Sequence, residues 1–142
     1  MKTIFNMIAA AALVAIPAMA NAADVKVDLS GVRAGGTIYV QLQTRGQFMG
    51  PARAYGEIVR TPSAGAVSLT LKDVAPGDYA VTIWHDDNGN QKFDMDPATG
   101  RPTDGWATVN AEALRGPPVF DQVKATVGDV PLTLSLPLHY GR

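Results

Sequence analysis

The stretch DYAVTIWH, residues 78–85, decides the fold. Its residues alternate between two faces, of which one carries Tyr79, Val81 and Ile83 and the other Ala80, Thr82 and Trp84. Successive residues of a strand point to opposite sides of a sheet, so both faces of this strand are suited to burial. The pattern therefore predicts a central strand.

The same period of two recurs on both sides of this stretch, over residues 25–29, 37–43, 66–71, 120–127 and 132–138. Residues 106–110 predict one more short strand, while residues 44–63 predict a loop with a short irregular strand or helical turn. Pro137 confines its end of the last strand to an edge or an exit. No long segment has a helical period, so about seven short strands predict a single all-β sandwich.

The first 22 residues have the pattern of a secretory signal peptide. Lys2 supplies a positive charge, residues 7–16 are apolar, and Ala20-Asn21-Ala22 places small residues around a cleavage site. The apolar run is too short to span a membrane. We expect residues 1–22 to be removed on export, and residues 23–142 to form one domain in the periplasm or the medium.

Composition excludes several functional classes. The 142-residue chain has no cysteine, so it contains no disulfide, no lipid-modified cysteine and no thiolate ligand. Without the leader it has eleven basic and thirteen acidic residues, which are scattered rather than clustered. No nucleic-acid partner is therefore expected. A partner at the cell surface or envelope and the oligomeric state stay open.

A run of oxygen-bearing side chains follows the central strand directly. Asp86, Asn88, Asn90 and Asp94 occupy positions one, three, five and nine of a loop, which is the ligand order of calcium-binding loops. Lys92 stands at position seven, where such loops use the backbone carbonyl, so its ammonium group does not conflict with a site. The spacing predicts a calcium site.

The loop departs from a helix-loop-helix calcium hand at two positions. Gln91 replaces the glycine of position six, and Pro97 replaces the glutamate of position twelve. Asp96 or Asp104 would have to complete the ligand shell instead. The alternative is an exposed turn without metal, because aspartate, asparagine and glycine also favour Asx-turns and left-handed backbone.

The chain also resembles a known family. The shared residues are His85-Asp86-x-Asn88-Gly89-Asn90, Phe93-Asp94, Gly100-x-Pro102, Gly105-Trp106, Asn110, residues 75–81, Gly116-Pro117-Pro118-x-Phe120 and the last strand up to Tyr140. They are similar to the exported bacterial family known as domain of unknown function 2141. The resemblance implies an exported β-sandwich of immunoglobulin-like or transthyretin-like type with no established activity. Family members usually carry glycine at the position of Gln91.

Three functions are compatible with these residues. The first is a calcium-stabilised accessory or binding protein in which Trp84, His85, Trp106 and Asn110 support the loop. The second is a hydrolase that uses the loop carboxylates with His85 as acid and base. The third is carbohydrate or peptide recognition by Trp84, Trp106 and Tyr140. Because no catalytic motif is present, we expect a protein that is not an enzyme.

Overall fold

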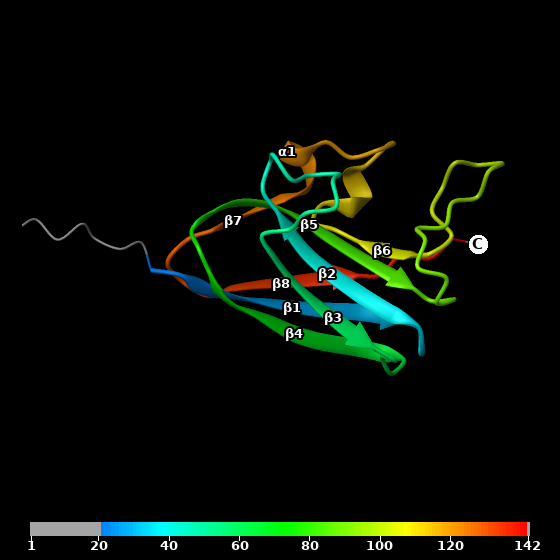
Figure 1. Cartoon of the computed structure of the whole chain (residues 1–142), viewed down its shortest axis with the longest axis horizontal. Coiled ribbons are helices and arrows are strands. Elements are labelled where there is room, and N and C mark those ends of the chain that lie inside the picture. The colour runs from blue at the N-terminus through cyan, green and yellow to red at the C-terminus, as the bar shows by residue number, and fades with distance from the viewer. Residues whose placement is uncertain (1–20, 142) are drawn as a thin grey trace, which may run out of the picture.

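Two packed β-sheets form the protein, as the computed structural model shows for residues 21–141 (Figure 1). The three-stranded sheet contains, in order, β4 (Gly65–Val74), β1 (Ala23–Val32) and β8 (Leu132–Pro137). The five-stranded sheet contains β3 (Tyr55–Arg60), β2 (Thr37–Gln43) and β5 (Gly77–Asp86), with β6 (Gly105–Ala107) and β7 (Lys124–Val127) both paired to the far edge of β5. This confirms the predicted all-β sandwich.

The core lies between the sheets and follows the alternation of the sequence. Its completely buried side chains come from every second residue, and they include Val25, Val27, Leu29, Ile38, Val40, Leu42, Val81 and Ile83. Burying one aliphatic side chain of this size contributes about 1.5–3 kcal/mol relative to its exposure. With no disulfide present, this apolar burial is what stabilises the sandwich.

The position of β5 confirms the prediction of a central strand. It pairs with β2 on one side, and with β6 and β7 on the other. β8 lies at the edge of its sheet, where Pro137 removes no hydrogen bond between central strands. β8 runs parallel to β1, a pairing that strand patterns alone do not predict.

Two predicted strands are shorter than the sequence pattern indicated. Residues 120–127 divide into a helical turn, α1 (Phe120–Val123), and β7. Phe120 and Val123 are three residues apart, so a helical turn buries both of them, and the Gln122 side chain accepts a hydrogen bond from the Val119 N–H at 3.0 Å. The predicted strand 106–110 ends at Ala107, because Asn110 takes a left-handed conformation that leads into the 3₁₀ turn η1 (Ala111–Ala113).

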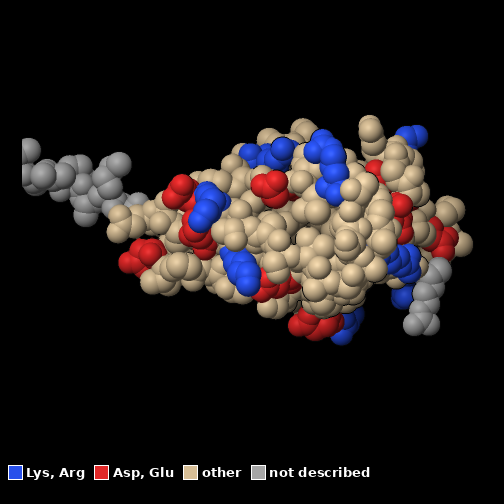
Figure 2. All heavy atoms as spheres, turned by 90° about the horizontal axis from the view of Figure 1, so that it is seen from below, with Lys and Arg blue, Asp and Glu red and all other residues tan. Residues whose placement is uncertain are grey.

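Basic and acidic side chains are interspersed on the surface, as the face in Figure 2 shows. Several of them form exposed ion pairs, such as Lys72 with Asp24 and Arg45 with Asp121. Exposed pairs of this kind contribute little to stability. Among residues 21–141 no helix is long and apolar enough to cross a membrane.

The predicted signal peptide lies almost entirely outside the described residues, which include only Asn21 and Ala22 of it. Both are exposed, and β1 begins at the next residue, Ala23. The predicted cleavage point therefore coincides with the start of the first strand of the sandwich.

Candidate functional site

The acidic loop begins at the end of β5 and extends beyond the strands beside the C-terminus (Figure 1). Asp86, its first residue, is buried, and its two carboxylate oxygens accept the backbone N–H groups of Asn90 at 3.2 Å and Gln91 at 2.8 Å. This carboxylate turns the loop back on itself. Asp86 is therefore part of the fold of the loop, whether or not a cation is bound.

The other predicted ligands converge on the same turn. One oxygen of Asp94, Oδ2, accepts the side-chain amides of Asn88 at 2.8 Å and Asn90 at 2.7 Å. The side-chain oxygens of the two asparagines accept backbone N–H groups two residues further on, from Asn90 and Lys92. The side chains of positions three, five and nine thus form one hydrogen-bonded cluster, to which Asp86 is joined through the Asn90 backbone.

Asp104 joins this cluster to the sheet, whereas Asp96 lies apart. The buried Asp104 carboxylate accepts the indole N–H of Trp84 at 2.8 Å and the backbone N–H of Asp94 at 3.1 Å. Asp96 belongs to an outer hairpin and accepts the Ala98 N–H at 2.8 Å, and this hydrogen bond lowers the pKa of its carboxyl group. Of the two additional candidates, only Asp104 contacts the loop.

Charge in this cluster is not balanced by basic side chains. Asp86 and Asp104 are each 1% exposed, and neither they nor Asp94 form an ion pair with any residue between 21 and 141. A buried carboxylate without an opposite charge is costly unless it is hydrogen-bonded or binds a cation. The N–H groups that these carboxylates accept offset part of this cost.

Oxygen is the donor type that this cluster offers. Within residues 21–141, no group of three or more His, Cys, Asp or Glu side chains is arranged to hold a metal ion. A cation at the loop would therefore depend on amide and backbone oxygens together with Asp86 and Asp94. Calcium accepts such mixed oxygen ligands, including carboxamides and carbonyls, whereas zinc prefers histidine and thiolate.

The backbone of the loop is left-handed at two positions. Gly89 has a φ of 71°, which glycine adopts freely, but Gln91 has a φ of 62° and carries a side chain. A non-glycine residue in this region is strained by roughly 1 kcal/mol or more. This position is the sixth of the loop, where calcium loops use glycine, and its backbone is left-handed here although the residue is not glycine.

His85 holds the base of the loop from inside the protein. It is completely buried, with Nε2 2.7 Å from the Gly35 carbonyl oxygen and Nδ1 2.6 Å from the Tyr140 hydroxyl. Because a carbonyl only accepts, Nε2 carries the hydrogen, and Nδ1 accepts from Tyr140. Burial raises the pKa of Tyr140, which keeps its hydroxyl protonated as a donor at neutral pH.

The two tryptophans have different surroundings. Trp84 lies beneath the loop, stacked on Tyr39 with ring centroids 4.8 Å apart and in edge contact with Phe93 at 6.2 Å. Trp106 instead contacts His139 away from the acidic cluster, with the ring centroids 4.8 Å apart and the planes tilted by 32°. Thus Trp84 supports the loop directly, through Asp104 and Phe93, and Trp106 does not.

Asn110 also lies apart from the acidic loop. Its side-chain amide donates to the Gln122 carbonyl at 3.2 Å, so it fixes the connection to α1.

Sequence reasoning missed Gly36, which precedes β2. Gly36 packs so closely against the backbone of Asp86 and Asp87 that a Cβ atom on it would overlap with that backbone. No local pattern marks this contact, which joins residues 50 positions apart.

The fold and this loop define a class of protein: a β-sandwich with an Asx-rich acidic loop at the end of its central strand. The chain belongs to the family described as "Uncharacterized protein conserved in bacteria (DUF2141)", whose model matches residues 27–134. This match confirms the resemblance seen in the sequence. No curated protein and no solved structure matches the chain.

Proposed function

We propose that the protein is an exported accessory or binding β-sandwich whose loop from Asp86 to Asp94 binds calcium and is stabilised by it. The observation that carries this proposal is the combination of buried carboxylates that form no ion pair with two asparagine side chains gathered on the Asp94 carboxylate in the same turn. The backbone carbonyl of Lys92 is a further oxygen that this loop contributes, and Asp104, which accepts the Trp84 and Asp94 N–H groups, supports the loop from the sheet. Asp96, tied to Ala98, is not included.

The proposal excludes a catalytic role for His85. Both ring nitrogens are engaged, and the side chain is completely buried, so a substrate has no access to it. A general base must come within hydrogen-bond reach of the proton that it removes. The geometry therefore supports the role of His85 in holding the loop over the hydrolase alternative.

Calcium should raise the thermal midpoint of the protein. Extracellular modules bind calcium with dissociation constants of about 0.1–1 mM, so about 5 mM calcium would add on the order of 1–2.3 kcal/mol to the free energy of unfolding. For a domain of this size the expected shift is several degrees. Magnesium should produce a smaller shift, because it gives up its water ligands reluctantly.

Asp94→Ala is the cleanest variant for this experiment. Asp94 accepts two exposed amides, which water can satisfy, whereas removing Asp86 would also leave two backbone N–H groups without acceptors. Asp94→Ala should abolish most of the calcium shift while leaving the midpoint in chelator nearly unchanged. The matched control is Asp96→Ala, which removes an equal charge two residues away and should keep the full shift. Equal responses of the two variants would contradict the site.

Export is tested separately from calcium binding. We expect the exported protein to begin at Ala23, because small residues at positions 20 and 22 fit the requirements of signal peptidase. Intact-mass spectrometry of protein recovered from the periplasm or the medium would show the loss of residues 1–22. A mass that retains these residues would identify them as an uncleaved anchor.

A further inference from the structure

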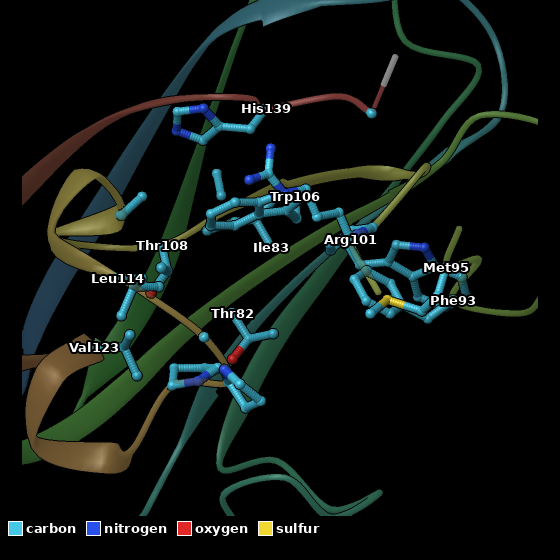
Figure 3. A pocket seen from close by; sticks show the side chains of 18 of the residues that line it. Thr82, Ile83, Phe93, Met95, Arg101, Trp106, Thr108, Leu114, Val123 and His139 are labelled. Atoms are coloured by element: carbon cyan, nitrogen blue, oxygen red, sulfur yellow. The ribbon is translucent and has the colours of Figure 1, made fainter. Parts of the chain in front are cut away.

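A groove with a volume of about 1450 Å³ lies on the outer face of the five-stranded sheet, beside the acidic loop (Figure 3). Of the five exposed large hydrophobic side chains among the described residues, three line this groove: Met49, Phe93 and Met95. Apolar side chains that gather at one depression, while the rest of the surface is mixed, are typical of a binding site.

A row of aromatic side chains crosses the groove. Tyr39, Trp84, Trp106 and His139 are successive partners on neighbouring strands, as the pairings of β2 with β5, of β5 with β6, and of Trp106 with His139 show. Tyr39 stacks on Trp84, and His139 contacts Trp106 at a tilt of 32°, with no ring contact between Trp84 and Trp106 among the described residues. The sides of the two indoles that face each other are therefore not covered by aromatic neighbours.

The groove also contains polar groups that an apolar occupant would leave unsatisfied. Gln41 and Thr82 are half-buried on its floor and are paired with each other on β2 and β5, beside Tyr39 and Trp84 of the row. His139 Nε2 is buried without a hydrogen-bond partner in the part of the chain that the structure describes. Covering the side chains of Gln41 and Thr82 with a hydrocarbon chain would cost free energy, because they would lose water and gain no partner.

The charged residues along the groove balance one another. Arg101 and Arg115 are basic, Asp96 and Glu112 are acidic, and Figure 3 shows Arg101 extending toward Trp106. This lining favours neither an anion nor a cation. The strands of the groove floor, β2 and β5, are each hydrogen-bonded to a neighbouring strand on both sides. A peptide strand would therefore find no free sheet edge here.

We infer that this groove binds a neutral oligosaccharide chain. A pyranose ring has an apolar face of C–H groups that packs on an aromatic ring, and hydroxyl groups around its rim that hydrogen-bond to polar side chains. The groove offers both, with Trp84 and Trp106 as the apolar surfaces and Gln41 and Thr82 as hydrogen-bonding partners. This inference names a ligand class for the binding role proposed above and rests on that role, but not on calcium.

The groove and the acidic loop share one wall. Asp94 faces the asparagine cluster, and its neighbour Phe93 contacts Trp84 at the edge of the groove. A cation at the loop would fix the position of Phe93. Calcium is therefore expected to strengthen oligosaccharide binding without being required for it.

The test uses the mature protein with chitohexaose, cellohexaose and maltohexaose as probes. Binding of each probe is measured by tryptophan fluorescence and by calorimetry. At least one of the three should bind saturably and change the fluorescence. Trp106→Ala should weaken that binding at least about tenfold. Val130→Ala, which shortens an exposed side chain outside the groove, should bind as the unsubstituted protein does.

Thr82→Val separates an oligosaccharide from an apolar ligand, because it removes a hydroxyl without changing the shape of the floor. It should weaken oligosaccharide binding roughly three- to tenfold. The inference is overturned if none of the probes binds, if only an apolar dye such as anilinonaphthalene sulfonate binds, or if Thr82→Val binds the probes more tightly. The probe affinity of Trp106→Ala is compared with that of the unsubstituted protein under conditions in which both are folded to the same extent. A loss of stability is then not mistaken for a loss of binding.

Three further outcomes of these measurements distinguish a failure of the oligosaccharide inference from a failure of the proposed function. Binding that is equal in chelator and calcium, with no calcium shift of the midpoint, would leave the groove assignment standing and refute the calcium loop. A probe recovered hydrolysed would refute the non-catalytic role. A normal calcium shift without binding of any probe would refute the groove assignment alone.

Discussion

Gly36→Ala is expected to lower the thermal midpoint of the protein by about 10 °C or more. Gly36 has a left-handed φ of 68°, and a Cβ atom would overlap with the backbone of Asp86 and Asp87, which cannot move without shifting the start of the acidic loop. Overpacking costs about 1–3 kcal/mol, and the strained φ roughly 1 kcal/mol or more. Each 1 kcal/mol corresponds to about 3–5 °C in a domain of this size.

Gly35→Ala is the matched control for this prediction. Gly35 is also left-handed, with a φ of 83°, but a Cβ atom there would meet nothing within 4 Å. Only the backbone strain remains, so its midpoint should fall by roughly 3–5 °C. Calorimetric scans of both variants would compare the two positions. Equal losses would show that contact of Gly36 with Asp86 does not matter for stability.

His85→Ala should be equally damaging. The substitution removes a completely buried ring and leaves the Tyr140 hydroxyl and the Gly35 carbonyl without their partners. Truncating a buried aromatic side chain costs about 3–5 kcal/mol. The expected decrease of the midpoint is therefore roughly 10–20 °C.

The second histidine provides a control for His85. His139 is only partly buried and lies tilted against Trp106, and its buried Nε2 has no hydrogen-bond partner among residues 21–141. His139→Ala should cost no more than about 1.5 kcal/mol, the contribution of an aromatic pair. Chemical denaturation would measure both losses. A His85→Ala variant as stable as His139→Ala would contradict the role of His85 in holding the loop to Tyr140 and Gly35.

Much of the fold could be predicted because burial repeats with the period of a strand. The residues around Val27, Val40 and Ile83 alternate between core and outer face over whole strands, so their type and orientation follow from the sequence. Phe120 and Val123 fit a helical turn as well as a strand end, and the prediction chose wrongly there. The parallel pairing of β1 with β8 depends on packing of the whole domain, which no local pattern carries.

The candidate site could be predicted to a similar extent. Spacing of two residues brings Asn88 and Asn90 to the same carboxylate, that of Asp94, and this is a local property of the chain. The hydrogen bond between His85 and Tyr140 joins residues 55 positions apart, so no local pattern indicates it. The same is true of Gly36 beside Asp86.

The most direct test of the proposed calcium site is a calcium titration of the isotope-labelled mature protein. The amide resonances are observed in two-dimensional NMR spectra at each calcium concentration. The amides of Asn90, Gln91 and Lys92 donate to loop oxygens, so a cation at those oxygens must change their shifts. We predict saturable movement of these three amides, with a dissociation constant of about 0.1–1 mM. Spectra in which these amides stay in place, while calcium is raised well beyond that range, would contradict a calcium site in the loop.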